Sequence, residues 1–379
     1  YQCSALRSVT IGDSVTSIGE STFKYCIALT ELTIGTSVDT IGNQAFQECK
    51  ALQSVTIPDS VTSIGTSAFY QCSKLQSVTI PDGVTSISKN AFSRCSKLTT
   101  LTIGKSVTSI GLSAFNRCSK LTTVTIPDSV TTIGTSAFAH CTSLTTLTIP
   151  DSVKTIGNNA FRECSILQSL TIGTSVETIG EGAFYKCNAL QSVTIPDSVT
   201  SIGNYAFELC SNLLSVTLGA SVKTIGEGAF KDCIALQSVT IGTSVETIGN
   251  EAFRDCIALQ SLTIPDSVTK IGENAFQSCG ISSVTMGAAT ASLFDLTPNL
   301  NQAFFGQKSV FIKISVDAAF YQPGIISGDG SGFDNWLSAN IQIALRYYKP
   351  SLRTFEQPRE ELLIVDLSKV AAIENVSIT

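Results

Sequence analysis

Several residue types that enzymes depend on are nearly absent from this chain of 379 residues, which has one histidine, one tryptophan and one methionine. His140 has no partner fixed by the sequence, and there are no paired carboxylates and no phosphate loop of the type G-x-x-x-x-G-K-[ST]. We therefore expect no enzyme and no cofactor. The net charge of −6 argues against nucleic acid as a partner. No run approaches 18 apolar residues, so no membrane span is predicted.

Cysteine is absent except at 13 positions, which recur every 23 residues from Cys3 to Cys279. A fixed period of this size indicates one small unit that is copied and stacked. Equivalent Cβ atoms of stacked strands lie about 4.8 Å apart, beyond the roughly 3.8 Å of a disulfide. No C-x-x-C pair is present, so zinc is not favoured either. We expect a ladder of free, buried cysteines that belongs to the core, with disulfides or a metal array as alternatives.

The repeat reads C-x-x-L-x-x-V-x-I-P/G-D-S-V-T-x-I-G-x-x-A-F-x-x. Apolar and hydroxyl residues alternate at 54–57, which predicts a half-buried strand, and a turn follows at 58–60. A second extended piece is expected at 61–64, closed by Gly65. About one helical turn is expected at 66–71. Stacking such coils would place Leu on Leu, Ile on Ile and Phe on Phe in a continuous core.

The signature L-x-S-V-T-I-P-D-S-V-T-S-I-G-x-x-A-F-x-x-C, as in Leu52 to Cys72, runs through twelve full repeats. It resembles the BspA-like, or Treponema-pallidum-type, leucine-rich repeats of bacterial surface proteins and microbial eukaryotes, over residues 1–287. The resemblance implies an α/β repeat solenoid, a right-handed leucine-rich-repeat coil with a parallel β-sheet, and adhesive roles at the cell surface. Ser14 and Ser60 stand where the better-known consensus has Asn or Cys, so the curvature of the classical horseshoe is not carried over.

One set of candidate binding residues consists of threonines. Thr stands seven residues after the cysteine in all twelve repeats, and T-x-T pairs end at Thr102, Thr125 and Thr148. Thr is a common neutral residue of strands, so the file can be simple filler. The alternative is a flat, charge-free face for sugar hydroxyls or for ice, because such ladders resemble the ice-binding faces of antifreeze proteins.

The second set is the residue that precedes each cysteine. It varies between otherwise nearly identical repeats, which predicts that it is exposed to solvent. Arg94 and Arg117 form a basic spot in this column, and Glu163 and Asp232 are acidic members. These residues are candidate contacts with a protein or glycan partner. His140 belongs to the same column and is expected to be an exposed helix residue.

Residues 288–379 form the second expected domain, a small α+β unit that caps the solenoid or docks it to an assembly. Strands are expected at 310–316 and 362–367, and the apolar positions of 333–348 fit one helix face. Trp336 on that helix is the candidate docking residue.

The chain begins inside a repeat, because Tyr1 to Cys3 matches Tyr70 to Cys72, and we expect the natural protein to extend upstream. One N-glycosylation sequon, Asn375-Val376-Ser377, is a hint of secretion. The leading hypothesis is a non-catalytic recognition solenoid, extracellular or at the cell surface, that binds a protein or glycan along one face. The alternatives are a structural spacer docked through residues 288–379, and ice binding through the threonines.

Overall fold

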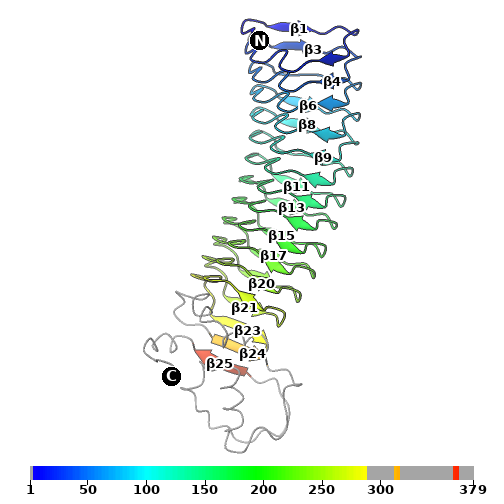
Figure 1. Ribbon diagram of the computed structural model, residues 1–379. Coiled ribbons are helices and arrows are strands. Elements are labelled where there is room, and N and C mark those ends of the chain that lie inside the picture. Colours follow the sequence, from blue (N-terminus) through cyan, green and yellow to red (C-terminus); the bar gives the residue numbers. More distant parts are fainter. Residues whose placement is uncertain (1–2, 288–310, 316–361, 367–379) are drawn as a thin grey trace, which may run out of the picture.

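The chain winds into stacked coils of 23 residues that form a long, bent rod (Figure 1). The computed structural model describes residues 3–287, 311–315 and 362–366. Each coil runs from one cysteine to the residue before the next, and we name it by that cysteine. The regular elements of the described residues are all β-strands. The expected α/β class is therefore wrong for the repeats, which contain strands and turns but no helix among the described residues.

The first strand of each coil starts five residues after its cysteine. Its middle residue is apolar and faces the core, while the flanking Ser or Thr faces outward, because successive side chains of a strand alternate between faces. The Cys49 coil has only a bridge here, between Ser54 and Ser77, and the Cys118 coil has no strand at 123–125. The strands of this series are β1 Ser8–Thr10, β3 Glu31–Thr33, β6 Ser77–Thr79, β8 Thr100–Thr102, β11 Thr146–Thr148, β13 Ser169–Thr171, β15 Ser192–Thr194, β17 Ser215–Thr217, β19 Ser238–Thr240 and β21 Ser261–Ile264.

The second strand of each coil is shorter and ends at the isoleucine that precedes the Gly column of the repeat. The strands of both series pair in parallel with a register of 23 residues, so that Val216 lies opposite Val193 and Val239. This confirms the predicted parallel stacking. The strands of the second series are β2 Ser17–Ile18, β4 Thr40–Ile41, β5 Ser63–Ile64, β7 Ser86–Ile87, β9 Ser109–Ile110, β10 Thr132–Ile133, β12 Thr155–Ile156, β14 Thr178–Ile179, β16 Ser201–Ile202, β18 Thr224–Ile225, β20 Thr247–Ile248 and β22 Lys270–Ile271.

The segment after the second strand is not helical, so the helical turn expected at 66–71 is wrong. Ser67 and Gln71 have left-handed backbones, with φ of 56° and 60°. The N–H groups of Ser67, Phe69 and Gln71 donate to carbonyls of the next coil at 2.8–2.9 Å, while the residues between them close i→i−3 turns. Bonds to the next coil thus replace the i→i−4 bonds of a helix. Every buried N–H needs an acceptor, and stacking supplies one that a lone coil lacks.

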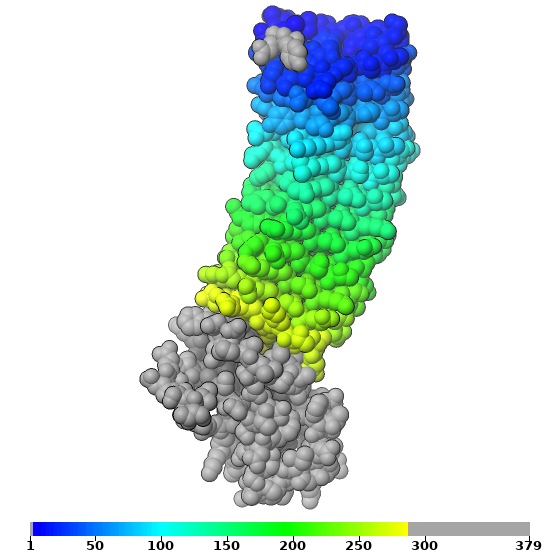
Figure 2. All heavy atoms as spheres, in the orientation of Figure 1, coloured from blue at the N-terminus to red at the C-terminus, as the bar shows by residue number. Residues whose placement is uncertain are grey.

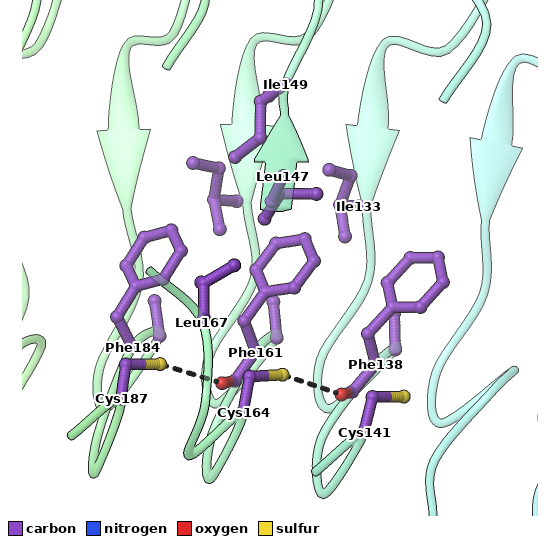
Figure 3. Packing of buried hydrophobic residues seen from close by; sticks show 14 of the residues in the cluster. Ile133, Phe138, Cys141, Leu147, Ile149, Phe161, Cys164, Leu167, Phe184 and Cys187 are labelled. Atoms are coloured by element: carbon purple, nitrogen blue, oxygen red, sulfur yellow. Dashed lines mark hydrogen bonds between the residues drawn. The ribbon is translucent and has the colours of Figure 1, made fainter. Parts of the chain in front are cut away.

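The core is a set of ladders that run the length of the rod. Phenylalanine rings of successive coils stack with centroids 5.2–5.6 Å apart and planes within 14°. Beside them lies the cysteine ladder (Figure 3), in which every thiol is free and only Cys3 is exposed. This confirms the cysteine prediction.

Each cysteine from Cys49 onward also makes a hydrogen bond that explains why the position is cysteine. The Cys164 thiol donates to the carbonyl of Phe138 at 3.5 Å, and the Cys187 thiol to that of Phe161 at 3.4 Å (Figure 3). The same bond recurs along the ladder at 3.0–3.5 Å. A small apolar side chain with a weak donor fits this site, so that the thiol both fills space and links two coils.

The second-strand series is interrupted at one seam, between the Cys49 and Cys72 coils. β2, β4 and β5 form one sheet, and the nine strands from β7 to β22 form another. Ten glycines of this column donate their N–H to an isoleucine carbonyl of the preceding coil at 2.8–2.9 Å. A Cβ at Gly134 would lie 2.8 Å from such a carbonyl oxygen. Ser88 stands in this column with a Cβ, which explains why β7 does not close onto β5.

The last coil is extended by strands from the second expected domain. β23 (Ser283–Gly287) pairs in parallel with β24 (Phe311–Ser315), which pairs antiparallel with β25 (Leu362–Asp366). The strands predicted at 310–316 and 362–367 are confirmed. The expected helix at 333–348, with Trp336, lies outside the described residues. Among the residues that are described, none forms a helix with the length and apolarity to cross a membrane.

Candidate ligand-binding groove

An open groove of about 490 Å³ runs along the rod above the cysteine ladder. The residue before each cysteine has φ of 58–62° here, and this left-handed turn directs its side chain outward while the cysteine points inward. The space-filling view shows the coils in contact along the described rod, so that side chains, not gaps between coils, shape its surface (Figure 2). The lining consists of the residues on either side of four successive cysteines, and one more: Gln71, Ser73, Arg94, Ser96, Arg117, Ser119, His140, Thr142 and Glu163.

The centre of the groove is basic. Arg94 and Arg117 are exposed, and neither is within 4 Å of a carboxylate among the described residues. The Arg94 guanidinium instead lies 5.9 Å from the centroid of the Tyr70 ring. Two positive charges in neighbouring coils are therefore available to an anion, because no carboxylate of the described chain neutralises them.

One end of the groove is closed by an ion pair. His140 Nδ1 lies 2.9 Å from Glu163 Oε2, and Arg162 Nε lies 3.6 Å from Glu163 Oε1. The Arg162 guanidinium is 4.1 Å from the centroid of the Tyr185 ring. His140 is half-buried in a turn, so the expectation of an exposed helix residue without a fixed partner is wrong. Glu163 is engaged by these two neighbours and leaves the arginines free.

The floor of the groove is lined by hydroxyl groups whose hydrogens are already used. Ser96 Oγ donates to the Ser73 carbonyl at 3.4 Å, Ser119 Oγ to the Ser96 carbonyl at 3.3 Å, and Thr142 Oγ1 to the Ser119 carbonyl at 3.4 Å. A hydroxyl that donates inward keeps its lone pairs for an outside donor. The floor therefore accepts hydrogen bonds, while the arginines donate them.

Cations beside this column are paired with carboxylates at the far end of the rod. Lys231 Nζ lies 2.6 Å from Glu251, and Arg254 bonds to Glu251 at 3.0 Å and to Asp255 at 3.2 Å. Burial raises the pKa of Asp232 in this cluster, and the neighbouring Asp255 adds to the shift. Lys231 and Arg254 are therefore paired with carboxylates, unlike the two arginines of the groove.

The other candidates from the sequence do not lie in the groove. Thr102 in β8 and Thr148 in β11 are exposed on the outer face of the first-strand series. They belong to two separate sheets, and the exposed Thr125 between them is in no strand. The three T-x-T pairs thus do not share one continuous sheet. Trp336 lies outside the described residues.

Three lysines that directly follow lining serines were not among the candidates from the sequence. Lys74, Lys97 and Lys120 are exposed and follow the lining serines in the short turn that begins at each cysteine, as in the bond from Leu75 N–H to the Cys72 carbonyl. The signal was present as the tripeptide Ser-Lys-Leu after three successive cysteines. In the part of the chain that the structure describes, no three His, Cys, Asp or Glu side chains are placed to hold a metal ion.

The coil, its ladders and the parallel strand series define the protein as a leucine-rich-repeat solenoid. The chain belongs to the family described as BspA type leucine rich repeat region, whose model matches residues 1–122, 109–236, 178–296 and 223–316. No curated protein matches the sequence.

One solved structure of a similar protein supports the same fold, and two further solved structures have similar sequences. A leucine-rich repeat protein from Bacteroides ovatus is 25% identical with a TM-score of 0.54, over 83% of this chain and 85% of that one. A leucine rich cell surface protein from Faecalibacterium prausnitzii is 33% identical with a TM-score of 0.46, over 75% and 74%. The T. pallidum leucine rich repeat protein is 30% identical with a TM-score of 0.37, over 48% and 77%.

Proposed function

We propose that this chain is a non-catalytic recognition solenoid, at the cell surface or outside the cell, that binds a protein or glycan partner in the groove between Gln71 and Glu163. The observation that carries the proposal is the pair of exposed arginines, Arg94 and Arg117, with no carboxylate within 4 Å in the described chain. Positive side chains without a carboxylate partner attract a negatively charged ligand to a groove and help to orient it. The extracellular location is proposed from the resemblance to BspA-like surface proteins.

The chemistry of the groove supports binding rather than catalysis. A hydrolytic site needs a nucleophile within hydrogen-bond reach of a base. The hydroxyls of Ser96, Ser119 and Thr142 donate to backbone carbonyls, and the one imidazole, His140, is bonded to Glu163. These groups hold the groove in shape, and none is paired as nucleophile and base.

A charge-matched set of variants tests the proposal. The full chain, the variant Arg94→Gln with Arg117→Gln, and the control Lys154→Gln with Lys270→Gln are applied to an array of glycans and extracellular-matrix proteins. Glutamine is already tolerated in the groove column at Gln71, which has the same left-handed backbone. We expect the parent to bind at least one member of the array, the groove variant to lose tenfold or more in affinity, and the control to stay within twofold.

Two outcomes would contradict recognition through this groove. One is equal binding by the parent and the groove variant, and the other is an equal loss in the control. A parent that binds nothing on the array while assembling with itself would instead favour the structural spacer, docked through residues 288–379.

A further inference from the structure

The basic character of the groove extends well beyond the two arginines. Residues 70–142 contain seven Lys and Arg and only two acidic residues, Asp82 and Asp128, in a chain whose net charge is −6. Both aspartates lie in the turn after the first strand, on the other side of that strand from the groove column. The five cations beside the groove are Lys74, Arg94, Lys97, Arg117 and Lys120.

These cations recur in step with the coils. Arg94 and Arg117 occupy the same column in successive coils, as do Lys74, Lys97 and Lys120 in a neighbouring column. The coils beneath them are separated by about 5 Å, as the stacked rings of Phe92 and Phe115 at 5.6 Å and of Phe69 and Phe92 at 5.2 Å show. One sugar residue of an extended polysaccharide advances by a similar length. A linear polymer with an anionic group on each sugar would therefore meet one cation pair per coil.

The lining residues indicate a sugar rather than a peptide. None of the nine lining residues is aliphatic, and none is Phe, Tyr or Trp, whereas peptide grooves take their affinity from apolar anchors. Proteins that bind single-stranded nucleic acid commonly stack its bases on Phe, Tyr or Trp, and the lining has none of these three residues. A floor of hydroxyl acceptors between guanidinium and ammonium donors instead matches sugar hydroxyls flanked by carboxylates or sulfates.

We propose that the groove binds a linear acidic polysaccharide, one that carries a carboxylate or sulfate on successive sugars, along the cations from Lys74 to Lys120. This inference rests on the proposed function and names the ligand of the same groove. Arg94 and Arg117 hold the acidic groups by charge-assisted hydrogen bonds, and Ser96 and Ser119 accept from the ring hydroxyls. The His140–Glu163 pair limits the site at one end, because both side chains are bonded to each other and leave no free cation for a further acidic group.

The test uses probes that differ in charge and share a backbone. Binding of the full chain is measured by calorimetry with polygalacturonate and with its methyl ester, and with dextran sulfate and dextran. We expect binding of an acidic probe and at least tenfold weaker binding of its neutral counterpart. Raising the salt from 0.05 to 0.5 M should weaken acid binding severalfold, because exposed charges are screened within a few ångströms at high salt. The carboxylated and sulfated probes together distinguish which acid is preferred.

Variants place the interaction in the groove. Arg117→Gln should reduce affinity for the acidic probe about fivefold or more, whereas Lys186→Gln, the same charge change in the same column outside the groove, should leave it within twofold. Circular dichroism confirms that both variants are folded.

Two results would overturn the inference in different ways. Binding of poly-glutamate or of a protein that is lost in Arg117→Gln, with no binding of either acidic polysaccharide, leaves the recognition function and rejects the sugar ligand. Equal affinity of Arg117→Gln and Lys186→Gln for the acidic probe rejects the groove itself, and with it the proposed function.

Discussion

Raising the pH from 7 to 9 should destabilise this protein far more than it does most proteins, because a ladder of thiols is buried without any base. Ten cysteines, from Cys49 to Cys256, have no exposed surface. Burial raises the pKa of Cys49, Cys141 and Cys210 to about 12, and it also raises the pKa of the other seven well above the ordinary value of a thiol. The thiols therefore stay protonated in the folded chain throughout this range.

The sign of the effect follows from where protons are lost. A free cysteine in the unfolded chain has a pKa of about 8.5, so only the unfolded chain releases protons between pH 7 and 9. The contribution of the protonated thiols to the free energy of unfolding is fully present below about pH 8.5, and it is lost as the pH rises toward 12. Each thiol costs about 0.8 kcal/mol between pH 7 and 9, hence about 8 kcal/mol for ten thiols that unfold together. This is comparable with the whole stability of an ordinary domain.

Urea unfolding followed by far-UV circular dichroism, with a phosphine reductant present, measures the free energy of unfolding at the two pH values. The control replaces Cys118, Cys141 and Cys164 with alanine. The truncation lowers stability at both pH values, but it removes three of ten titrating groups, so the drop between pH 7 and 9 should shrink by about 2.4 kcal/mol. A drop below about 1 kcal/mol in the parent, or an unchanged drop in the triple variant, would refute the reasoning.

Four other changes have defined outcomes. Phe161→Ala removes a fully buried ring stacked between Phe138 and Phe184 and should cost about 3–5 kcal/mol of unfolding free energy, measured by urea titration; a loss under 1 kcal/mol would show that the stack closes around the gap. Gly134→Ala places a Cβ 2.8 Å from the Ile110 carbonyl oxygen and should speed hydrogen exchange of its own amide at least tenfold. Ser88→Gly should slow exchange of the residue 88 amide by joining β7 to β5, and an unchanged rate would mean that another cause separates these sheets. Asn158→Ala removes the acceptor of the Glu181 N–H at 3.0 Å and should cost about 1 kcal/mol of unfolding free energy, with Asn158→Asp, which keeps an acceptor oxygen, as the comparison.

The period of the sequence was enough to predict the stacked coil, the parallel strands and the core ladders. Each depends on residues that repeat in every coil, such as the buried Phe and Leu columns, and identical neighbours leave little choice of partner. The turn at 66–71 was mistaken for a helix because Ala favours a helix and six residues are too few to show or exclude a helical period. What decides the conformation is the set of N–H groups that bond to the following coil, and such bonds between coils leave no mark within one repeat.

The groove was found only in part for a related reason. The variable column was recognised as a surface, and Arg94, Arg117 and Glu163 do line one groove. Lys74, Lys97 and Lys120 were overlooked because they stand on the other side of the cysteine, and only the turn geometry shows that both sides share one surface. The bond between His140 and Glu163 joins residues 23 apart, and it follows from stacking rather than from any local motif.

Successive coils are joined by the same hydrogen bonds, and this affects how the gene for such a protein can change in length. From coil to coil, a Phe carbonyl accepts a hydrogen bond from a cysteine thiol, and N–H groups donate to carbonyls of the next coil. A whole coil can therefore be removed or inserted without leaving one of these groups unpaired. Unequal crossing-over between near-identical gene segments then yields a folded product with a longer or shorter rod. Duplication of the coil from Cys95 to Arg117 would lengthen the groove by one further arginine and one further lysine. Selection can therefore change the length of the binding surface one coil at a time, without changing the stability of each interface between coils.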